Sequence, residues 1–154
     1  MPVLVRTRSV RSSPMRPAEL RRRAERMLVA AGAPAAELSV LLCDDGVIAE
    51  LNERYRHKRG PTDVLAFAMQ EGDPPGPADH LLGDVVISVD TARRQARAHR
   101  HTIAEELTAL LAHGILHLLG YDHRSRREER RMNALADGLR AAARSRADRP
   151  GGRG

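Results

Sequence analysis

Residues 113–123 read HGILHLLGYDH, and this stretch determines both the expected central helix and the candidate site. Because helix residues four apart share a face, His113 and His117 can point at one ion. Gly120 follows where a helix ending in a left-handed turn favours glycine, and that turn can bring His123 to the same ion. Three imidazoles with one open position are typical of a catalytic zinc, whereas a structural zinc has four protein ligands. The stretch therefore predicts a metal site at the end of a helix.

The apolar pattern on either side predicts an α+β fold. Strands are expected at 3–10, 38–43, 63–68 and 82–89, and helices at 17–31, 47–55, 90–99, 102–119 and 125–139. Strands interspersed with helices indicate one small mixed sheet of about four strands, packed with about five helices around the metal-binding helix. A single domain is expected over residues 1–146, followed by a disordered tail at 147–154.

Local signals predict how several elements begin. Residues 102–105 (TIAE) and 125–128 (SRRE) have the spacing of a capping box. Residues 90–91 (DT) are expected to cap the start of the helix that runs to about His99, and residues 44–46 (DDG) are expected to form a turn. The central helix is therefore expected to start at Thr102.

Composition favours an anionic partner. The formal net charge is +6, and every one of the 26 basic residues except Lys58 is arginine. The planar guanidinium suits phosphate, so nucleic acid is the first candidate partner. A GC-rich codon bias would explain arginine in place of lysine, but not the excess of positive charge. The single Cys43 excludes a disulfide within the chain and a cysteine zinc cluster.

The sequence also carries information on location. The first ten residues lack the long apolar segment of a signal peptide, and no stretch is long enough to span a membrane. A cytoplasmic protein without a membrane partner is expected.

The histidine spacing is shared with the metzincin proteases, which need a glutamate directly after the first histidine as general base. This chain has Gly114 there, so the usual peptidase route is missing. Phosphodiester cleavage needs positive charge opposite the developing phosphorane, and the basic segment from Arg56 to Arg59 can supply it if the fold brings it to the metal.

These residues resemble the signature of the YbeY family of bacterial endoribonucleases. All eleven positions of 113–123 match, and 51–56 (LNERYR) with 61–67 (PTDVLAF) and 82–85 (LGDV) resemble two further motifs in the same order. Two departures are Ala66, where serine is usual, and Arg59, where an acidic residue is common. Both leave the histidines intact and make the substrate contacts of this segment less certain to carry over.

The resemblance implies a single-domain fold with one zinc ion per chain on His113, His117 and His123. It implies a role in ribosomal RNA maturation near the 3′ end of the small-subunit RNA and in ribosome quality control. The expected partners are single-stranded RNA, the small ribosomal subunit and its assembly factors. The functional arginine of the family corresponds to Arg56, which is the expected catalytic residue.

Three functions are compatible with the sequence. In the first, a metal-dependent endoribonuclease holds the scissile phosphate with Arg56 and binds nearby backbone with Lys58 and Arg59. In the second, the protein is a ribosome-assembly factor that binds RNA without cutting it, and its zinc holds the helix end and the following turn together. The third, a metal-dependent amide hydrolase, is disfavoured by Gly114 and by the basic charge.

Overall fold

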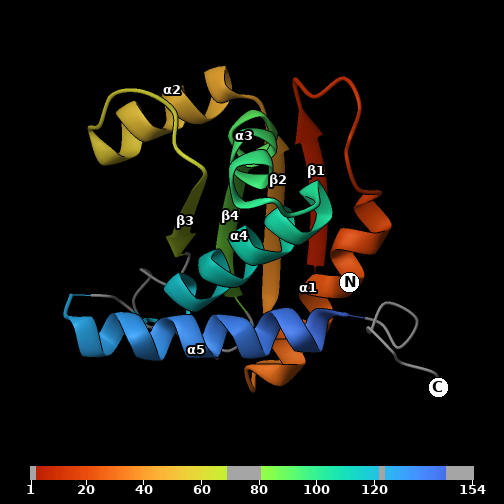
Figure 1. The fold of residues 1–154 in the computed structure, drawn as a ribbon, viewed down its shortest axis with the longest axis vertical. Coiled ribbons are helices and arrows are strands. Elements are labelled where there is room, and N and C mark those ends of the chain that lie inside the picture. The colour runs from red at the N-terminus through yellow and green to blue at the C-terminus, as the bar shows by residue number, and fades with distance from the viewer. Residues whose placement is uncertain (1–2, 69–80, 122–123, 145–154) are drawn as a thin grey trace.

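A computed structural model gives the structure of residues 3–68, 81–121 and 124–144. Within these ranges, helices pack on a four-stranded sheet (Figure 1). The strands are β1 (Val3–Arg8), β2 (Glu37–Cys43), β3 (Val64–Ala68) and β4 (Leu81–Ser88). The helices are α1 (Pro17–Ala30), α2 (Asp45–Arg56), α3 (Val89–His99), α4 (Ile103–Leu118) and α5 (Arg126–Ala143). The predicted α+β architecture is confirmed, while the predicted disordered tail at 147–154 lies outside the described residues.

The strand order is β1-β2-β4-β3. Strands β1, β2 and β4 run parallel, and β3 pairs with β4 in the antiparallel direction, which leaves β3 at one edge. Helices α1 and α4 pack on one face of the sheet. Helix α5 packs against both of these helices, on the side away from the sheet. Helix α2 packs on the opposite face, so the sheet lies between α2 and the other helices.

Alternation of side chains along the strands divides the core between the two faces of the sheet. The larger cluster joins Val40, Val85 and Ile87 to apolar residues of α1, α4 and α5. The smaller cluster joins Cys43, Val86 and neighbouring residues to α2. Burial raises the pKa of the Cys43 thiol to about 12, as expected for a small core residue without a partner.

Helix α4 packs closely against β4 at Gly114. A Cβ atom at this position would lie 2.7 and 2.9 Å from the two γ carbons of Val85. Carbon atoms in favourable contact are about 3.5–4.0 Å apart, so only glycine allows this approach. The residue that separates this chain from the metzincin pattern therefore has a packing role, and a glutamate could not occupy the same place without moving α4.

The predicted capping box at 102–105 is confirmed with both of its hydrogen bonds. At 125–128 the prediction is half correct: the Ser125 hydroxyl accepts from the Glu128 N–H, but the Glu128 carboxylate accepts from the N–H of Arg124. Such caps depend on residues close in sequence, which explains why the patterns located both helix starts.

Two predicted starts are wrong by one or two residues. The predicted turn at 44–46 is the first turn of α2, because the Asp44 carboxylate accepts from the Val47 N–H at 2.9 Å and caps the helix. Helix α3 begins directly after β4, and its cap is Ser88, whose hydroxyl accepts from the Thr91 N–H at 3.2 Å. The cap expected at Asp90 is therefore already inside the helix.

Candidate functional site

A cavity of about 900 Å³ opens between α4, β3 and the ends of α2 and α3. Its lining combines basic, acidic and imidazole side chains. The ionisable and amide residues that line it are Arg56, Asp63, Gln95, His99, His101, Glu106, His113, His117, Tyr121 and Arg140. Residues far apart in sequence therefore meet around one space, which is the candidate site.

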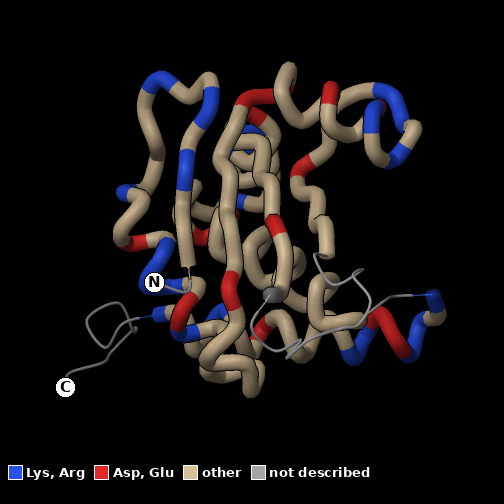
Figure 2. Tube along the Cα trace, turned by 180° about the vertical axis from the view of Figure 1, so that it is seen from behind, with Lys and Arg blue, Asp and Glu red and all other residues tan. Residues whose placement is uncertain are grey.

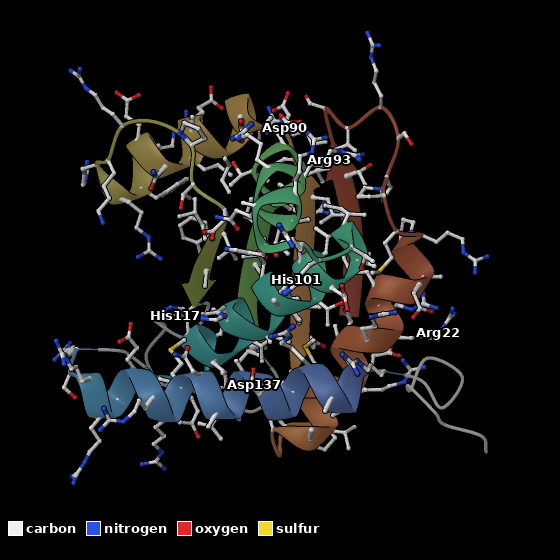
Figure 3. The ribbon with its side chains drawn as sticks, viewed as in Figure 1. Arg22, Asp90, Arg93, His101, His117 and Asp137 are labelled. Carbon is white, nitrogen blue, oxygen red and sulfur yellow. The ribbon has the colours of Figure 1, made fainter. Side chains whose placement is uncertain are left out.

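His113 and His117 both line this cavity from successive turns of α4. One nitrogen of the partly buried His113 ring, Nδ1, lies 3.4 Å from the Ala109 carbonyl oxygen. If Nδ1 donates there, Nε2 is left as an acceptor, which is the state a metal requires. His117 lies near the C-terminal end of α4 (Figure 3). The two helix histidines therefore line one cavity, while the third expected ligand, His123, lies outside the described residues.

The chain turns back directly after α4. Gly120 has a φ of +99°, its N–H donates to the His117 carbonyl, and the Tyr121 N–H donates to the Leu116 carbonyl. This pattern satisfies the last carbonyls of the helix and favours glycine at the left-handed position. The predicted helix stop is confirmed, and it returns Tyr121 to the cavity wall.

Arg56 lies at the C-terminal end of α2 and lines the same cavity as His113 and His117. Its Nη2 atom donates to the Ala66 carbonyl oxygen of β3 at 2.6 Å, and its Cζ atom lies 5.5 Å from the centre of the Phe67 ring. Tyr55 meets the same ring edge-on at 5.5 Å. The edge strand therefore positions this guanidinium, and the basic segment does reach the cavity at Arg56.

The other two predicted substrate-binding residues lie differently. Lys58 and Arg59 are exposed in the segment between α2 and β3, and neither lines the cavity. The buried Asn52 amide donates to the Gly60 carbonyl at 3.0 Å, which closes this segment into a loop. The positive charge of Lys58 and Arg59 is therefore available to a partner at the surface rather than within the cavity.

Basic residues lie at both edges of the sheet, beside β1 and beside β3 (Figure 2). Those on the β3 side form two groups. One group follows the end of α2, and a second occupies the start of α5. These two groups place positive charge above and below the edge strand, as expected for an anionic partner.

No helix among the described residues is both long enough and apolar enough to cross a membrane.

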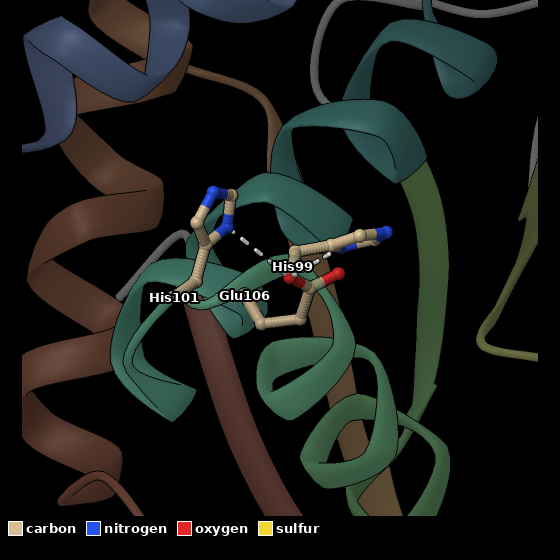
Figure 4. A group of neighbouring side chains, drawn as sticks. All are labelled: His99, His101 and Glu106. Atoms are coloured by element: carbon tan, nitrogen blue, oxygen red, sulfur yellow. Dashed lines mark hydrogen bonds and ion pairs between the residues drawn. The ribbon is translucent and has the colours of Figure 1, made fainter.

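Sequence analysis missed a second group of possible ligands in the cavity. His99, His101 and Glu106 place their ligand atoms within 4.8 Å of one another, and the three residues could hold a metal ion (Figure 4). The available signal was the pair of histidines two residues apart, followed by a glutamate in the first turns of α4. That signal is weak in sequence because nothing local shows that Glu106 faces back toward α3.

Two carboxylates line the cavity, and both are engaged. The Asp63 oxygens accept from the Val64 N–H at 2.7 Å and from the Gln95 amide at 3.2 Å. Glu106 contacts two imidazoles. Neither carboxylate therefore stands out as a general base for hydrolysis.

The fold and the cavity together define a small α+β protein with a histidine-rich site that could hold a metal ion. The family model for endoribonuclease YbeY matches residues 10–143. The chain belongs to this family, as its motifs predict.

Individual relatives agree with the family model. An endoribonuclease YbeY from Anaeromyxobacter sp. (strain Fw109-5) is 50% identical over 130 residues, which cover 80% of this chain and 66% of the relative. One from Syntrophotalea carbinolica is 50% identical over 113 residues, covering 72% of this chain and 75% of the relative. The chain thus spans slightly less than two thirds of the first relative.

The solution structure of TM1509 from Thermotoga maritima is similar in fold. The two superpose with a TM-score of 0.62 at 25% identity, over 92% of this chain and 88% of the other.

Proposed function

We propose that this protein is a zinc-dependent endoribonuclease that acts in the cytoplasm on single-stranded ribosomal RNA. The relevant substrate is the 3′ end of the small-subunit RNA, and the same activity serves ribosome quality control with the small subunit and its assembly factors. The relatives named above are endoribonucleases by name. The observation that carries the proposal is that Arg56 lines the same cavity as His113 and His117.

The donor set suits one zinc ion. His113 and His117 occupy one helix face, and His123 follows the turn at Gly120. Three neutral imidazoles leave the full charge of the ion uncompensated and one position open to substrate. When bound, zinc supplies positive charge that polarises a phosphoryl oxygen and acidifies water.

Arg56 would hold the scissile phosphate. A guanidinium has five N–H donors, and one of them is occupied by the Ala66 carbonyl. The remaining donors can grip two phosphoryl oxygens at once and stabilise the charge that develops there. Contact with the Phe67 ring restricts the side chain before substrate arrives, so less conformational freedom is lost on binding. Lys58 and Arg59 would bind RNA backbone outside the cavity.

Cleavage of a single-stranded ribosomal RNA fragment by Arg56→Ala tests this role. Loss of one transition-state donor is expected to reduce kcat by about 10²–10³-fold, with unchanged zinc content and thermal midpoint. Arg54→Ala is the matched control, because Arg54 is an exposed arginine on the same helix that does not line the cavity. Equal activities of the two variants would reject the assigned role of Arg56.

A second candidate function is an RNA-binding assembly factor that does not cut. It is favoured by the engagement of Asp63 and Glu106, the two carboxylates that line the cavity among the described residues, because neither is free to act as a base. Binding and cleavage measured on the same labelled RNA distinguish the two. Tight binding without product, in zinc, manganese and magnesium alike, would favour the assembly factor.

A further inference from the structure

Three side chains from three parts of the chain converge at the end of the cavity away from His117. His99 is the last residue of α3, His101 lies in the short connection, and Glu106 lies on α4. The Nδ1 atoms of His99 and His101 lie 3.3 and 3.4 Å from the same oxygen of Glu106 (Figure 4). All three residues line the cavity, so the cluster is open to solutes.

The Glu106 carboxylate needs a positive partner. Its side chain is only 6% exposed, and a buried charge is costly unless it is paired. In the described part of the chain no arginine or lysine forms an ion pair with it; its carboxylate forms a hydrogen bond with the His99 ring and lies at ion-pair distance from the His101 ring. An imidazole pairs with a carboxylate as a full charge only when it is protonated, whereas a metal ion held by the three side chains would supply positive charge directly.

The spacing fits a metal ion better than hydrogen bonds. Charge-assisted N–H···O bonds are about 2.7–2.9 Å long, and both distances to Glu106 exceed that range. Ligands about 2.0–2.2 Å from a tetrahedral zinc are separated by about 3.3–3.6 Å, which matches both distances. Two histidines and one glutamate are also a known ligand set of catalytic zinc, in which the fourth position stays open.

The local sequence builds this convergence. Arg100 adopts a left-handed conformation with φ of +59°, which is uncommon for a residue other than glycine or asparagine. The following N–H, that of His101, donates to the Ala96 carbonyl at 2.8 Å and turns the chain back over α3. The capping box at Thr102 then starts α4 within one residue, so Glu106 faces the two rings.

We propose that His99, His101 and Glu106 form a second zinc site, separate from the one proposed at His113, His117 and His123. Glu106 and His113 are seven residues apart on α4, on nearly the same face and about 10 Å along the axis. Paired catalytic ions lie about 3.5–4 Å apart, so the two ions do not share ligands. All three ligands line the cavity, so a bound ion would be within reach of an anionic oxygen such as that of a phosphate.

Zinc binding to the full chain tests the site without reference to nuclease activity. Metal-free protein is titrated with Zn²⁺ against a chromophoric chelator, and bound zinc is counted by native mass spectrometry. Two ions per chain are expected for the wild type and one for Glu106→Gln, which keeps the shape of the side chain. His117→Ala is expected to retain one ion, and the double variant none. His57→Asn, at an exposed histidine outside the cavity, is the matched control and should retain two.

The outcomes separate this proposal from the proposed function. Loss of zinc in Glu106→Gln but not in His117→Ala supports the second site and counts against the first. Unchanged zinc content in folded Glu106→Gln overturns the second site alone. A wild type that binds a single ion, lost in His117→Ala, overturns it as well. If Glu106→Gln does not fold, His101→Asn serves instead, because this ring is 37% exposed.

Discussion

Gly114→Ala is expected to destabilise the protein because of one close contact. The added methyl group would lie 2.7 Å from the nearest γ carbon of Val85, about 0.8 Å or more inside the favourable separation. Overpacking of this kind costs about 1–3 kcal/mol. Alanine has a higher helix propensity than glycine by about 1 kcal/mol, which offsets part of the cost. The expected net loss of unfolding free energy is therefore about 0–2 kcal/mol.

Gly138→Ala isolates the propensity contribution. Gly138 is exposed on α5, and a Cβ atom there would meet nothing within 4 Å. This variant should gain up to about 1 kcal/mol, so the two alanine variants should differ by about 1–3 kcal/mol. At about 2–4 °C per kcal/mol for a chain of this size, the difference is resolved in thermal melting followed by circular dichroism.

A double-mutant cycle with Val85→Ala identifies the contact responsible. Both close γ carbons are absent from that background, so Gly114→Ala should cost less there, and the higher helix propensity of alanine should offset more of the remaining cost. The reasoning is refuted if Gly114→Ala stabilises the protein as much as Gly138→Ala does, or if its cost is the same in both backgrounds. Because His113 adjoins Gly114, zinc affinity measured on the same variants reports whether the helix has shifted.

Three further predictions concern single side chains. Thr102→Ala removes the hydroxyl that caps α4 and should lower the unfolding free energy by about 1 kcal/mol in urea titrations, whereas Thr102→Ser should be nearly neutral. The Cys43 thiol, with its pKa raised to about 12 by burial, should resist iodoacetamide at pH 8 in the folded protein and react once it is unfolded; rapid labelling of folded protein would contradict this. Burial opposes ionisation of Asp45, but hydrogen bonds from Ser88 and from α3 outweigh it and lower the pKa of this carboxyl. Because the pKa of Asp45 is lower in the folded than in the unfolded chain, its ionised carboxylate stabilises the fold at pH values above the unfolded pKa. This stabilisation is lost as the pH falls and the carboxylate is protonated. Asp45→Asn should therefore be destabilising at pH 7 and progressively less so below about pH 4. A constant difference between pH 7 and pH 3 would show that Asp45 contributes through something other than its charge.

The two candidate metal sites differ in how visible they are in the sequence. His113 and His117 are recognisable because a helix relates residues four apart without any tertiary information. The pairing of Glu106 with His99 and His101 depends on the left-handed Arg100 and on the angle between two helices. The same reason explains Ser88, whose capping role requires that α3 follow β4 without a loop.

The sequence by itself determined the elements and the helical histidine pair. Apolar periodicity, the cap at Thr102 and the stop at Gly120 are local signals, because each involves a few neighbouring residues. Only the tertiary structure decided that β3 lies antiparallel at the sheet edge, that Arg56 reaches the cavity of His113, and that Gly114 touches Val85. Those contacts join residues between 10 and 60 positions apart, and packing of the whole chain selects them rather than any local preference.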